Sequence, residues 1–376
     1  MSRIGVLVSL TAARRGSVED VVVTLLQRLD PSEFRVALAA PRALLDAIAG
    51  DLHGVPVETE ALLADPWRPR DDVRRLSAFL DRVRPHVVTT HTLRATMLLA
   101  PLARWRGVKV VETYYGGGEG SRRWLVPGRV VSRLVAREIA VSEAARASLI
   151  RAGYPAEKIA VIPNGRDLSR FRSGIGRETI RRELGVDCTA PLVGVGGRLE
   201  PRKGHAEILE AWPSVAAEFP AARLVVIGDG ALRPRLEARV RELGLVGRVR
   251  FAGSPSDLAR LLDAIDLLVL PSLSDGMALT AIEAAAMGRP VIATAVDGVP
   301  EVIREARTGR LVPPADPTAL SRAIRGVLRD PLGAQRMGRA ARDFVLARFS
   351  LERQVAATAR VYREVAGTPR ALRRAA

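Results

Sequence analysis

Short apolar runs alternate with amphipathic stretches along most of this 376-residue chain. The runs are too short for helices and predict buried strands, whereas the stretches between them have the spacing of helices with one apolar face. This alternation is typical of parallel sheets covered by helices on both faces. Two series of strands are predicted. The first comprises Ile4–Ser9, Arg35–Ala40, His86–Thr90, Val108–Thr113, Glu138–Val141 and Ala160–Ile162, and the second comprises Leu192–Gly196, Arg223–Ile227, Arg248–Ala252, Leu267–Leu270 and Val291–Thr294.

The two series predict two doubly wound α/β domains, residues 1–168 and 169–350, followed by residues 351–376 with a helix at Leu351–Val365 and a basic tail. A polar segment rich in Gly and Arg, Asp167 to Asp187, is expected to be the interdomain linker. Ligands of open α/β sheets bind outside the carboxyl ends of the strands. We therefore expect a site where the carboxyl ends of both sheets face each other across a cleft.

Composition narrows the class of protein. The single cysteine, Cys188, excludes an internal disulfide framework and agrees with a reducing cytoplasm. Met1 to Leu10 is apolar but too short to span a membrane and lacks a signal peptide's charged start and cleavage site, so it is expected to hold the first strand. No other segment is expected to cross a bilayer.

The chain carries 58 basic and 41 acidic residues, a net charge of +17, and its bases are almost all Arg. Such a surface attracts polyanions. Three explanations of the positive charge are open: the chain binds anionic lipid headgroups, it binds nucleic acid, or its Arg content only reflects a genome rich in G and C. Nucleic acid is disfavoured, because aromatic residues make up 4% of the chain, no Cys/His zinc spacing occurs and the Arg residues form no single run.

The stretch from Leu270 to Ile303 carries the strongest functional signal. It predicts a strand, a turn-rich loop at Pro271–Gly276, a helix at Ala278–Met287 and a further strand. Backbone N–H groups at the start of that helix can hold a phosphate, and a carboxylate further along it can bind a diol. A sugar linked to a nucleoside diphosphate presents both groups. The residues concerned are Asp275, Gly276, Met277, Ala278, Leu279 and Glu283.

A second Gly-rich turn follows the strand at Leu192–Gly196. It contains Gly197, Arg198 and Lys203 and precedes a helix predicted at Ala206–Val215. Glycine lets the backbone approach an anion and the two cations neutralise it, although a solvated basic turn is the simpler alternative. A dinucleotide fingerprint is disfavoured because Leu199 stands where it needs a third Gly, and no P-loop sequence occurs. A dehydrogenase therefore has little support.

These segments resemble the donor site of the retaining glycosyltransferases of family 4, the group 1 transferases with the GT-B fold, whose signature is Glu, seven residues, Glu. Asp275 and Glu283 keep this spacing, while Met277 and Ala278 replace the usual Phe and Gly. The resemblance implies two Rossmann-like domains facing across a cleft, with the final helix crossing back to the first. It also implies that Arg198 and Lys203 bind the pyrophosphate, Glu283 the ribose and Asp275 the sugar.

Other segments extend the resemblance over most of the chain. Pro163 to Asp167 resembles the Pro-Asn-Gly-x-Asp end of the family's first domain, and Phe251 to Ser254 with Gly253 resembles a strand end beside the nucleotide base. Gly16 to Glu19 resembles a Gly-Gly-x-Glu loop that borders phosphates and acceptor, with Ser17 at the second Gly. Arg14 and Arg15 in this loop could contact an anionic acceptor.

The acceptor side is less well defined. His91 matches a cleft His that orients donor or acceptor, and Tyr114 or Tyr115 stands where the family often has another His. Ser121 to Arg137 mixes Arg with apolar residues at helical spacing, which is compatible with attachment to an anionic membrane and, more simply, with packing on the first sheet.

The resulting hypothesis is an enzyme that transfers a hexose, with retained configuration, to a lipid-linked or saccharide acceptor. UDP-sugars are the first choice of donor and GDP-mannose the second. No metal or cofactor is expected, since the sequence offers no Asp-x-Asp pair or His cluster. The expected role is synthesis of cell-envelope polysaccharide, lipopolysaccharide or glycolipid in the cytoplasm, with the inner face of the membrane as an alternative location. A nucleotide-sugar epimerase, a sugar phosphorylase, a non-catalytic sugar-nucleotide binder and a membrane scaffold are the alternatives.

Overall fold

The computed structural model describes residues 3–63, 69–116, 130, 132–174, 176–253 and 258–367. Contacts between residues divide the chain into two compact units. Unit 1 comprises Met1–Gly165 together with Leu351–Ala376, and unit 2 comprises Arg166–Ser350. The chain therefore enters unit 2 at Arg166 and leaves it at Ser350.

Unit 1 is built on a parallel sheet of seven strands in the order β3-β2-β1-β4-β5-β6-β7. The order reverses between β1 and β4, so the loops after these two strands border a crevice of the kind in which α/β sheets bind ligands. The strands are β1 (Ile4–Ser9), β2 (Phe34–Pro41), β3 (Val57–Leu62), β4 (Val87–Thr90), β5 (Lys109–Tyr114), β6 (Arg137–Ala140) and β7 (Ile159–Val161).

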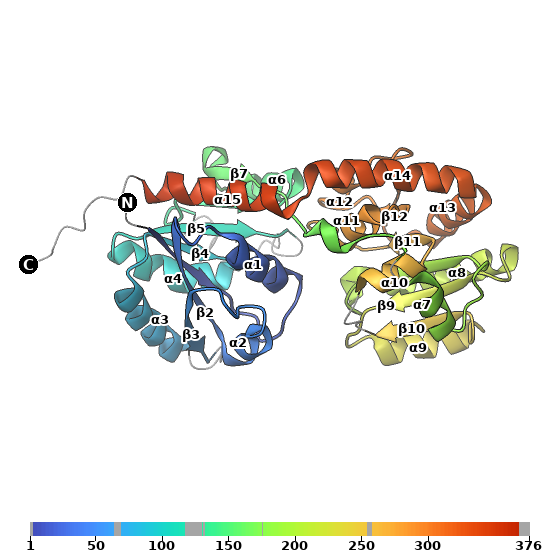
Figure 1. The fold of residues 1–376 in the computed structure, drawn as a ribbon, viewed down its shortest axis with the longest axis horizontal. Coiled ribbons are helices and arrows are strands. Elements are labelled where there is room, and N and C mark those ends of the chain that lie inside the picture. Colours follow the sequence, from blue (N-terminus) through green and yellow to red (C-terminus); the bar gives the residue numbers. More distant parts are fainter. Residues whose placement is uncertain are drawn as a thin grey trace, which may run out of the picture. The chain divides into compact units, whose positions relative to one another are not determined.

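Helices cover both faces of this sheet, as the alternating pattern predicts. One apolar core lies under α1 (Ser17–Arg28), α2 (Arg42–Ile48) and α15 (Leu351–Ala366). The other lies under α3 (Pro69–Val83) and α4 (Leu93–Trp105), while α6 (Glu143–Arg151) packs beside β6 and β7. Figure 1 shows α15, from the far end of the chain, lying along α1 and β5, with which it makes contacts.

Unit 2 has a parallel sheet of six strands in the order β10-β9-β8-β11-β12-β13. Its order reverses between β8 and β11, so the loops after these strands are the candidate ligand loops. The strands are β8 (Leu192–Gly196), β9 (Arg223–Ile227), β10 (Val249–Gly253), β11 (Leu267–Leu270), β12 (Val291–Thr294) and β13 (Arg310–Val312).

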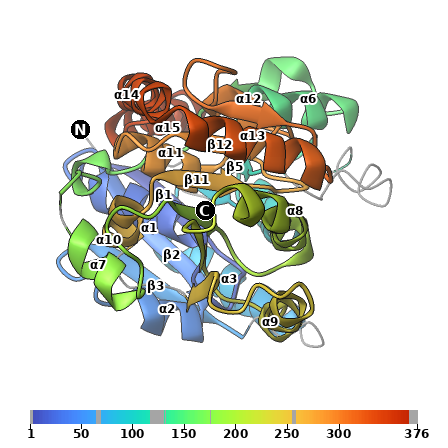
Figure 2. The same ribbon diagram turned by 90° about the vertical axis from the view of Figure 1, so that its right-hand side faces the viewer.

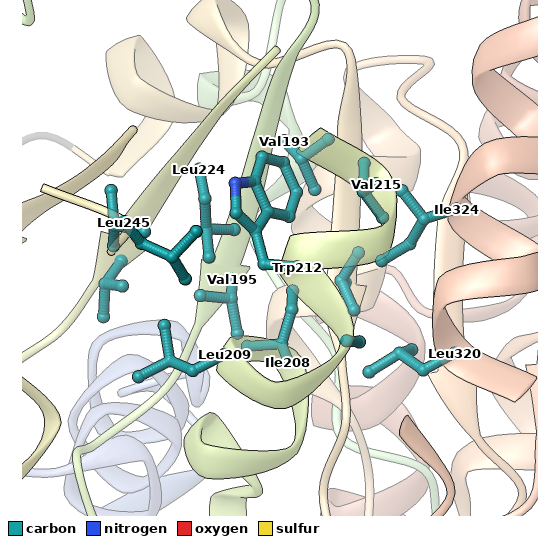
Figure 3. Packing of buried hydrophobic residues seen from close by; sticks show 14 of the residues in the cluster. Val193, Val195, Ile208, Leu209, Trp212, Val215, Leu224, Leu245, Leu320 and Ile324 are labelled. Atoms are coloured by element: carbon teal, nitrogen blue, oxygen red, sulfur yellow. The ribbon is translucent and has the colours of Figure 1, made fainter. Parts of the chain in front are cut away.

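The helices of unit 2 enclose a core centred on Trp212 of α8. The indole is fully buried among Val193 and Val195 of β8, Leu224 of β9 and Ile324 of α13 (Figure 3). Helices α7 and α10 pack side by side (Figure 2). The helices are α7 (Arg177–Glu183), α8 (His205–Glu218), α9 (Arg233–Glu242), α10 (Leu258–Ala264), α11 (Leu279–Ala286), α12 (Val299–Val302), α13 (Pro317–Arg329) and α14 (Pro331–Arg348).

The segment from Asp167 to Asp187 is not a linker, so that expectation was wrong. It contains α7 and belongs to unit 2. Arg181, one of the Arg residues of this segment, is buried and donates to Asp266 Oδ2 at 2.7 Å and to the carbonyls of Asp187, Cys188 and Ala190. A buried guanidinium with all these acceptors stabilises a compact structure.

Two predicted segments lie largely or wholly outside the described residues. They are the stretch from Ser121 to Arg137, of which only Val130 and Ser132 onward are described, and the tail from Pro369 to Ala376. Within the described ranges, no helix combines the length and apolar character needed to cross a membrane.

Candidate active site

Glycines allow two loops of unit 2 to lie in close contact. Gly204, between Lys203 and α8, has φ 66°, and a Cβ there would lie 1.8 Å from the carbonyl oxygen of Pro271 in the loop after β11. Gly197 has φ 136°, and a Cβ there would lie 3.4 Å from Cδ of Lys203. Only glycine permits both conformations and this close approach. The Gly-rich turn after β8 and the loop before α11 therefore form one surface.

Lys203 and Asp275 meet on this surface. Lys203 Nζ donates to Asp275 Oδ2 at 2.6 Å, and the two side chains are only 16% and 12% exposed. Ser272 Oγ donates to the same oxygen at 3.4 Å, and the Asp275 amide donates to Asp297 Oδ2 at 2.9 Å. Sequence reasoning missed Asp297, which fixes the loop that carries Asp275.

Glu283 lies on α11 and has a cationic partner that sequence reasoning also missed. Arg166 Nε is 2.9 Å from Glu283 Oε1, and the side chains are 17% and 6% exposed. Arg166 is the variable residue of the Pro-Asn-Gly-x-Asp segment, so an Arg within that motif was the only available signal. The two acids of the signature are thus each paired with a cation.

Arg198 has a different environment from Lys203. Its side chain is 62% exposed, and Nη1 lies 3.1 Å from Glu200 Oε1, which sits beside Arg202 as well. The structure therefore places Arg198 at the surface of the same turn and does not bring it to Asp275. Its guanidinium is accessible to an anion in solvent.

The start of α11 is buried. Gly276, Met277 and Ala278 are all buried, and Ala278 caps the helix without a side-chain hydrogen bond. The Leu279 amide donates to Met277 O at 2.8 Å, so this predicted phosphate donor is engaged in the turn. Gly253, at the end of β10, accepts from the Gly228 amide at 2.7 Å, which ties the predicted base-side strand end to β9.

His205 adds a buried neutral ring next to these groups. It is the first residue of α8, and neither ring nitrogen has a hydrogen-bond partner. Burial, and then the Lys203 charge, lower the pKa of His205 to about 4. The imidazole is therefore neutral near pH 7, and it adds no positive charge to the turn.

The predicted acceptor residues lie in unit 1. Gly16 caps α1 and Ser17 begins it, at the end of the loop that carries Arg14. Arg15 contacts Asp20 Oδ1 at 2.6 Å and Asp51 Oδ2 at 2.5 Å. An anionic acceptor would have to displace two carboxylates to bind Arg15, so the structure favours Arg14 over Arg15 for that role.

His91 directly follows β4 and contacts a Tyr hydroxyl. Its Nδ1 is 2.9 Å from the hydroxyl of Tyr115, so Tyr115 and not Tyr114 is the neighbouring ring. The His91 Nε2 atom is buried without a partner, and burial lowers the pKa of His91 to about 3. The ring is neutral and lines a small cavity together with Val22 of α1, Thr113 of β5, Gln354 and Tyr362 of α15, and Asn164 of the segment after β7.

Comparisons with known proteins assign the family. A model described as "Glycosyl transferases group 1" matches residues 176–344, and one described as "Glycosyltransferase Family 4" matches residues 18–170. A glycogen synthase of Mycobacterium tuberculosis is 30% identical over 293 residues, which are 74% of this chain and 69% of that protein. The chain belongs to the group 1 glycosyltransferases.

This group 1 glycosyltransferase also matches the D-inositol 3-phosphate glycosyltransferase of Streptomyces avermitilis, with 36% identity over 222 residues, 56% of this chain and 48% of that protein. The chain spans about half of the length of this relative. Anabaena Alr3699/HepE, in a crystal structure with UDP and glucose, has a TM-score of 0.83 and 22% identity over 96% of this chain and 99% of that one. The sucrose-phosphate synthase of Thermosynechococcus elongatus has a TM-score of 0.82 and 24% identity, over 96% of this chain and 99% of that one. Both confirm the GT-B fold.

Proposed function

We propose that this group 1 glycosyltransferase moves a sugar from a nucleoside diphosphate donor to an acceptor hydroxyl, with retained configuration and without a metal. The observation that carries the proposal is the Lys203–Asp275 contact beside the Gly-rich turn, with Glu283 on the helix that follows Asp275. An ammonium, a carboxylate for the sugar and a carboxylate for the ribose then lie in one unit. Alr3699/HepE, which has the same fold, was crystallised with UDP and with UDP-glucose, and this likeness favours a UDP-sugar as the donor. GDP-mannose is the second choice.

The difficult step is departure of the diphosphate while positive charge develops on the sugar. Lys203 and Arg198 would stabilise the negative charge of the leaving group, because preorganised donors aimed at developing charge lower the barrier. Asp275 would bind sugar hydroxyls and Glu283 the ribose hydroxyls. A donor phosphate oxygen on the face that the acceptor approaches would take the acceptor's proton, and this geometry retains the anomeric configuration.

The ion pair between Lys203 and Asp275 has a function in this scheme. Without a donor, the partly buried ammonium and carboxylate neutralise each other, which avoids the cost of an unpaired buried charge. A bound diphosphate supplies a second anion to Lys203 and leaves Asp275 able to accept from sugar hydroxyls. In the described residues, no three His, Cys, Asp or Glu side chains are grouped so that they could hold a metal ion.

We propose a lipid-linked or saccharide acceptor, bound near Arg14, Ser17 and His91 of unit 1, and a role in the synthesis of envelope glycans at the cytoplasmic face of the membrane. The net charge of +17 supports an anionic acceptor or membrane surface. The neutral His91 can act as a hydrogen-bond donor or acceptor to a hydroxyl at pH 5 to 8, since its pKa of about 3 lies well below that range.

The first prediction tests the leaving-group site. Lys203→Ala and Arg198→Ala should each lower the rate about 10²- to 10³-fold, as expected for the loss of one donor to a developing oxyanion. The assay measures free nucleoside diphosphate released in the presence of a chelator. Arg202→Ala is the matched control, because Arg202 lies in the same turn, pairs with Glu200 and has no assigned donor contact.

The same assay separates the alternatives. Transfer requires that nucleoside diphosphate appears only when an acceptor hydroxyl is supplied, whereas an epimerase releases none and a phosphorylase requires phosphate. Donor binding without release for any lipid or saccharide acceptor would favour a non-catalytic binder. Wild-type rates in both Lys203→Ala and Arg198→Ala would overturn the assigned roles. A thermal-shift screen of nucleoside diphosphates selects the base, since a ligand at about 100 times its Kd stabilises a protein by about 2.7 kcal/mol.

A further inference from the structure

Arg166 is fixed at the point where the chain enters unit 2. Its amide donates to Phe349 O at 2.9 Å, and it pairs with Ser350 in an isolated parallel bridge. Phe349 is buried, and Ser350 is the last residue of the same unit. The backbone of Arg166 is therefore held by the segment through which the chain leaves unit 2, and its side chain starts from a fixed position.

The side chain of Arg166 reaches the acid of α11. Arg166 Nε lies 2.9 Å from Glu283 Oε1, and this nitrogen is buried without a hydrogen bond of its own, so the contact is one between charges. The Glu283 side chain is only 6% exposed. Removing one partner of a buried ion pair is strongly unfavourable, so the contact with Arg166 constrains this carboxylate.

The other cations of the site are engaged elsewhere. Lys203 is hydrogen-bonded to Asp275 and Arg198 is paired with Glu200. Arg166 is thus placed to fix the orientation of Glu283 through their ion pair. A carboxylate held in one orientation can accept hydrogen bonds from two hydroxyls at once.

We propose that Arg166 is a positioning residue that holds the Glu283 carboxylate oriented to accept from both hydroxyls of the donor's ribose. This inference rests on the proposed donor site. Without Arg166, the carboxylate loses this ion pair, so its orientation is less fixed and its hydrogen bonds to the ribose weaken. The diphosphate, which Lys203 and Arg198 are proposed to bind, is affected much less.

The test compares ribose with 2′-deoxyribose. Calorimetry gives the Kd of UDP and 2′-deoxy-UDP, and of GDP and 2′-deoxy-GDP, for the wild-type chain, Arg166→Ala and Arg166→Lys. The wild type should bind the ribonucleotide about 10-fold more tightly or better, the effect of a hydrogen bond to a charged group. In Arg166→Ala, the ratio of the two Kd values should fall close to one, while the Kd of the deoxynucleotide changes less than about 3-fold. Arg166→Lys keeps the positive charge and should restore part of the preference for ribose.

Two further variants sharpen the test. Glu283→Gln should lose as much of the preference for the ribonucleotide as Arg166→Ala does. The double variant should lose no more than either single variant, because the effects of two residues that act through each other are not additive. Arg170→Ala is the matched control, since Arg170 lies four residues further on and is exposed. Should Arg166→Ala fail to fold, Arg166→Gln carries the same comparison.

The outcomes separate the inference from the function on which it rests. A wild-type ratio in Arg166→Ala overturns the inference and leaves the donor site standing. A wild-type chain that binds the ribonucleotide and the deoxynucleotide equally overturns the placement of the ribose at Glu283, and the inference with it. A wild-type chain that binds no nucleoside diphosphate overturns the proposed function itself.

Discussion

At the scale of single residues, Gly204 decides how closely the two candidate ligand loops approach. The second prediction compares it with Gly244, which has the same φ of 66° but open space where a Cβ would be. Gly244→Ala should cost about 1–2 kcal/mol, the cost of a left-handed conformation. Gly204→Ala should cost several kcal/mol, because its Cβ would lie 1.8 Å from Pro271 O and must push the loops apart.

Urea unfolding of both variants measures these costs, and calorimetry with the nucleoside diphosphate measures binding. Gly204→Ala should lose donor affinity through the displaced Lys203, whereas Gly244→Ala should bind as the wild type does. Equal destabilisation of the two variants would show that the close approach to Pro271 has no energetic weight, and the loops would then need another explanation for their contact.

Local spacing was enough to select Lys203 and Asp275 from two separate turns, and the structure brings their side chains to 2.6 Å. Their roles in the site stay predictions. Sequence reasoning failed where the partner lies far along the chain. The pairing of Arg166 with Glu283, and of Arg15 with Asp51, depends on tertiary contacts that no local pattern encodes.

At the scale of elements, the predicted strands were those with apolar residues, including β7 and β10 at two of the sheet edges. Every strand of the two predicted series is present, shifted by one residue at most. The two strands that were missed lie at the edges of the sheets. β3 reads VETEAL, with Glu58 and Glu60 paired to Arg82 at the surface, and β13 begins with the exposed Arg310. Edge strands need not be apolar, so the pattern that finds apolar strands does not detect these two.

The pairing of β5 with β6 gives the third prediction. Its register places Glu112 opposite Glu138, and both carboxyl groups are buried. Burial, then the charge of Glu112, raises the pKa of Glu138 well above its usual value, and Lys158 opposes this only in part. The folded state therefore favours the protonated form. The stability that this form provides is complete below the unfolded pKa of about 4.3 and is lost as the pH rises through the folded pKa.

Glu138→Gln cannot ionise, so its free energy of unfolding should fall less with rising pH than that of the wild type. The difference in the free energy of unfolding between Glu138→Gln and the wild type should grow by up to about 1.4 kcal/mol per pH unit above pH 4.5, until the pH passes the folded-state pKa of Glu138. Urea unfolding at a series of pH values measures it, and the exposed Glu157→Gln serves as the control. Parallel curves for Glu138→Gln and the wild type would contradict the assigned pKa.

At the scale of the whole molecule, unit 1 is assembled from both ends of the chain. Tyr362 of α15 is buried and packs edge to face on Phe34 of β2, with ring centroids 6.4 Å apart. Gln354 Oε1 accepts from the Gly165 amide at 2.8 Å, and Arg363 pairs with Glu33 at 2.5 Å. The final helix therefore completes the core of unit 1, although the chain has by then passed through all of unit 2.

This connectivity makes the two units separable by truncation. A chain that ends at Ser350 should lose stability in unit 1, by at least the 3–5 kcal/mol typical of removing one buried aromatic side chain, while unit 2 keeps all its internal contacts. Trp212 reports on unit 2 when the other three tryptophans are replaced by Phe. The unfolding midpoint measured by Trp212 fluorescence should stay unchanged, while the midpoint measured by circular dichroism, which reports on both units, falls or splits into two. A chain that ends at Gly367 retains α15 and is the control, and an equal fall of the Trp212 midpoint would contradict independent units.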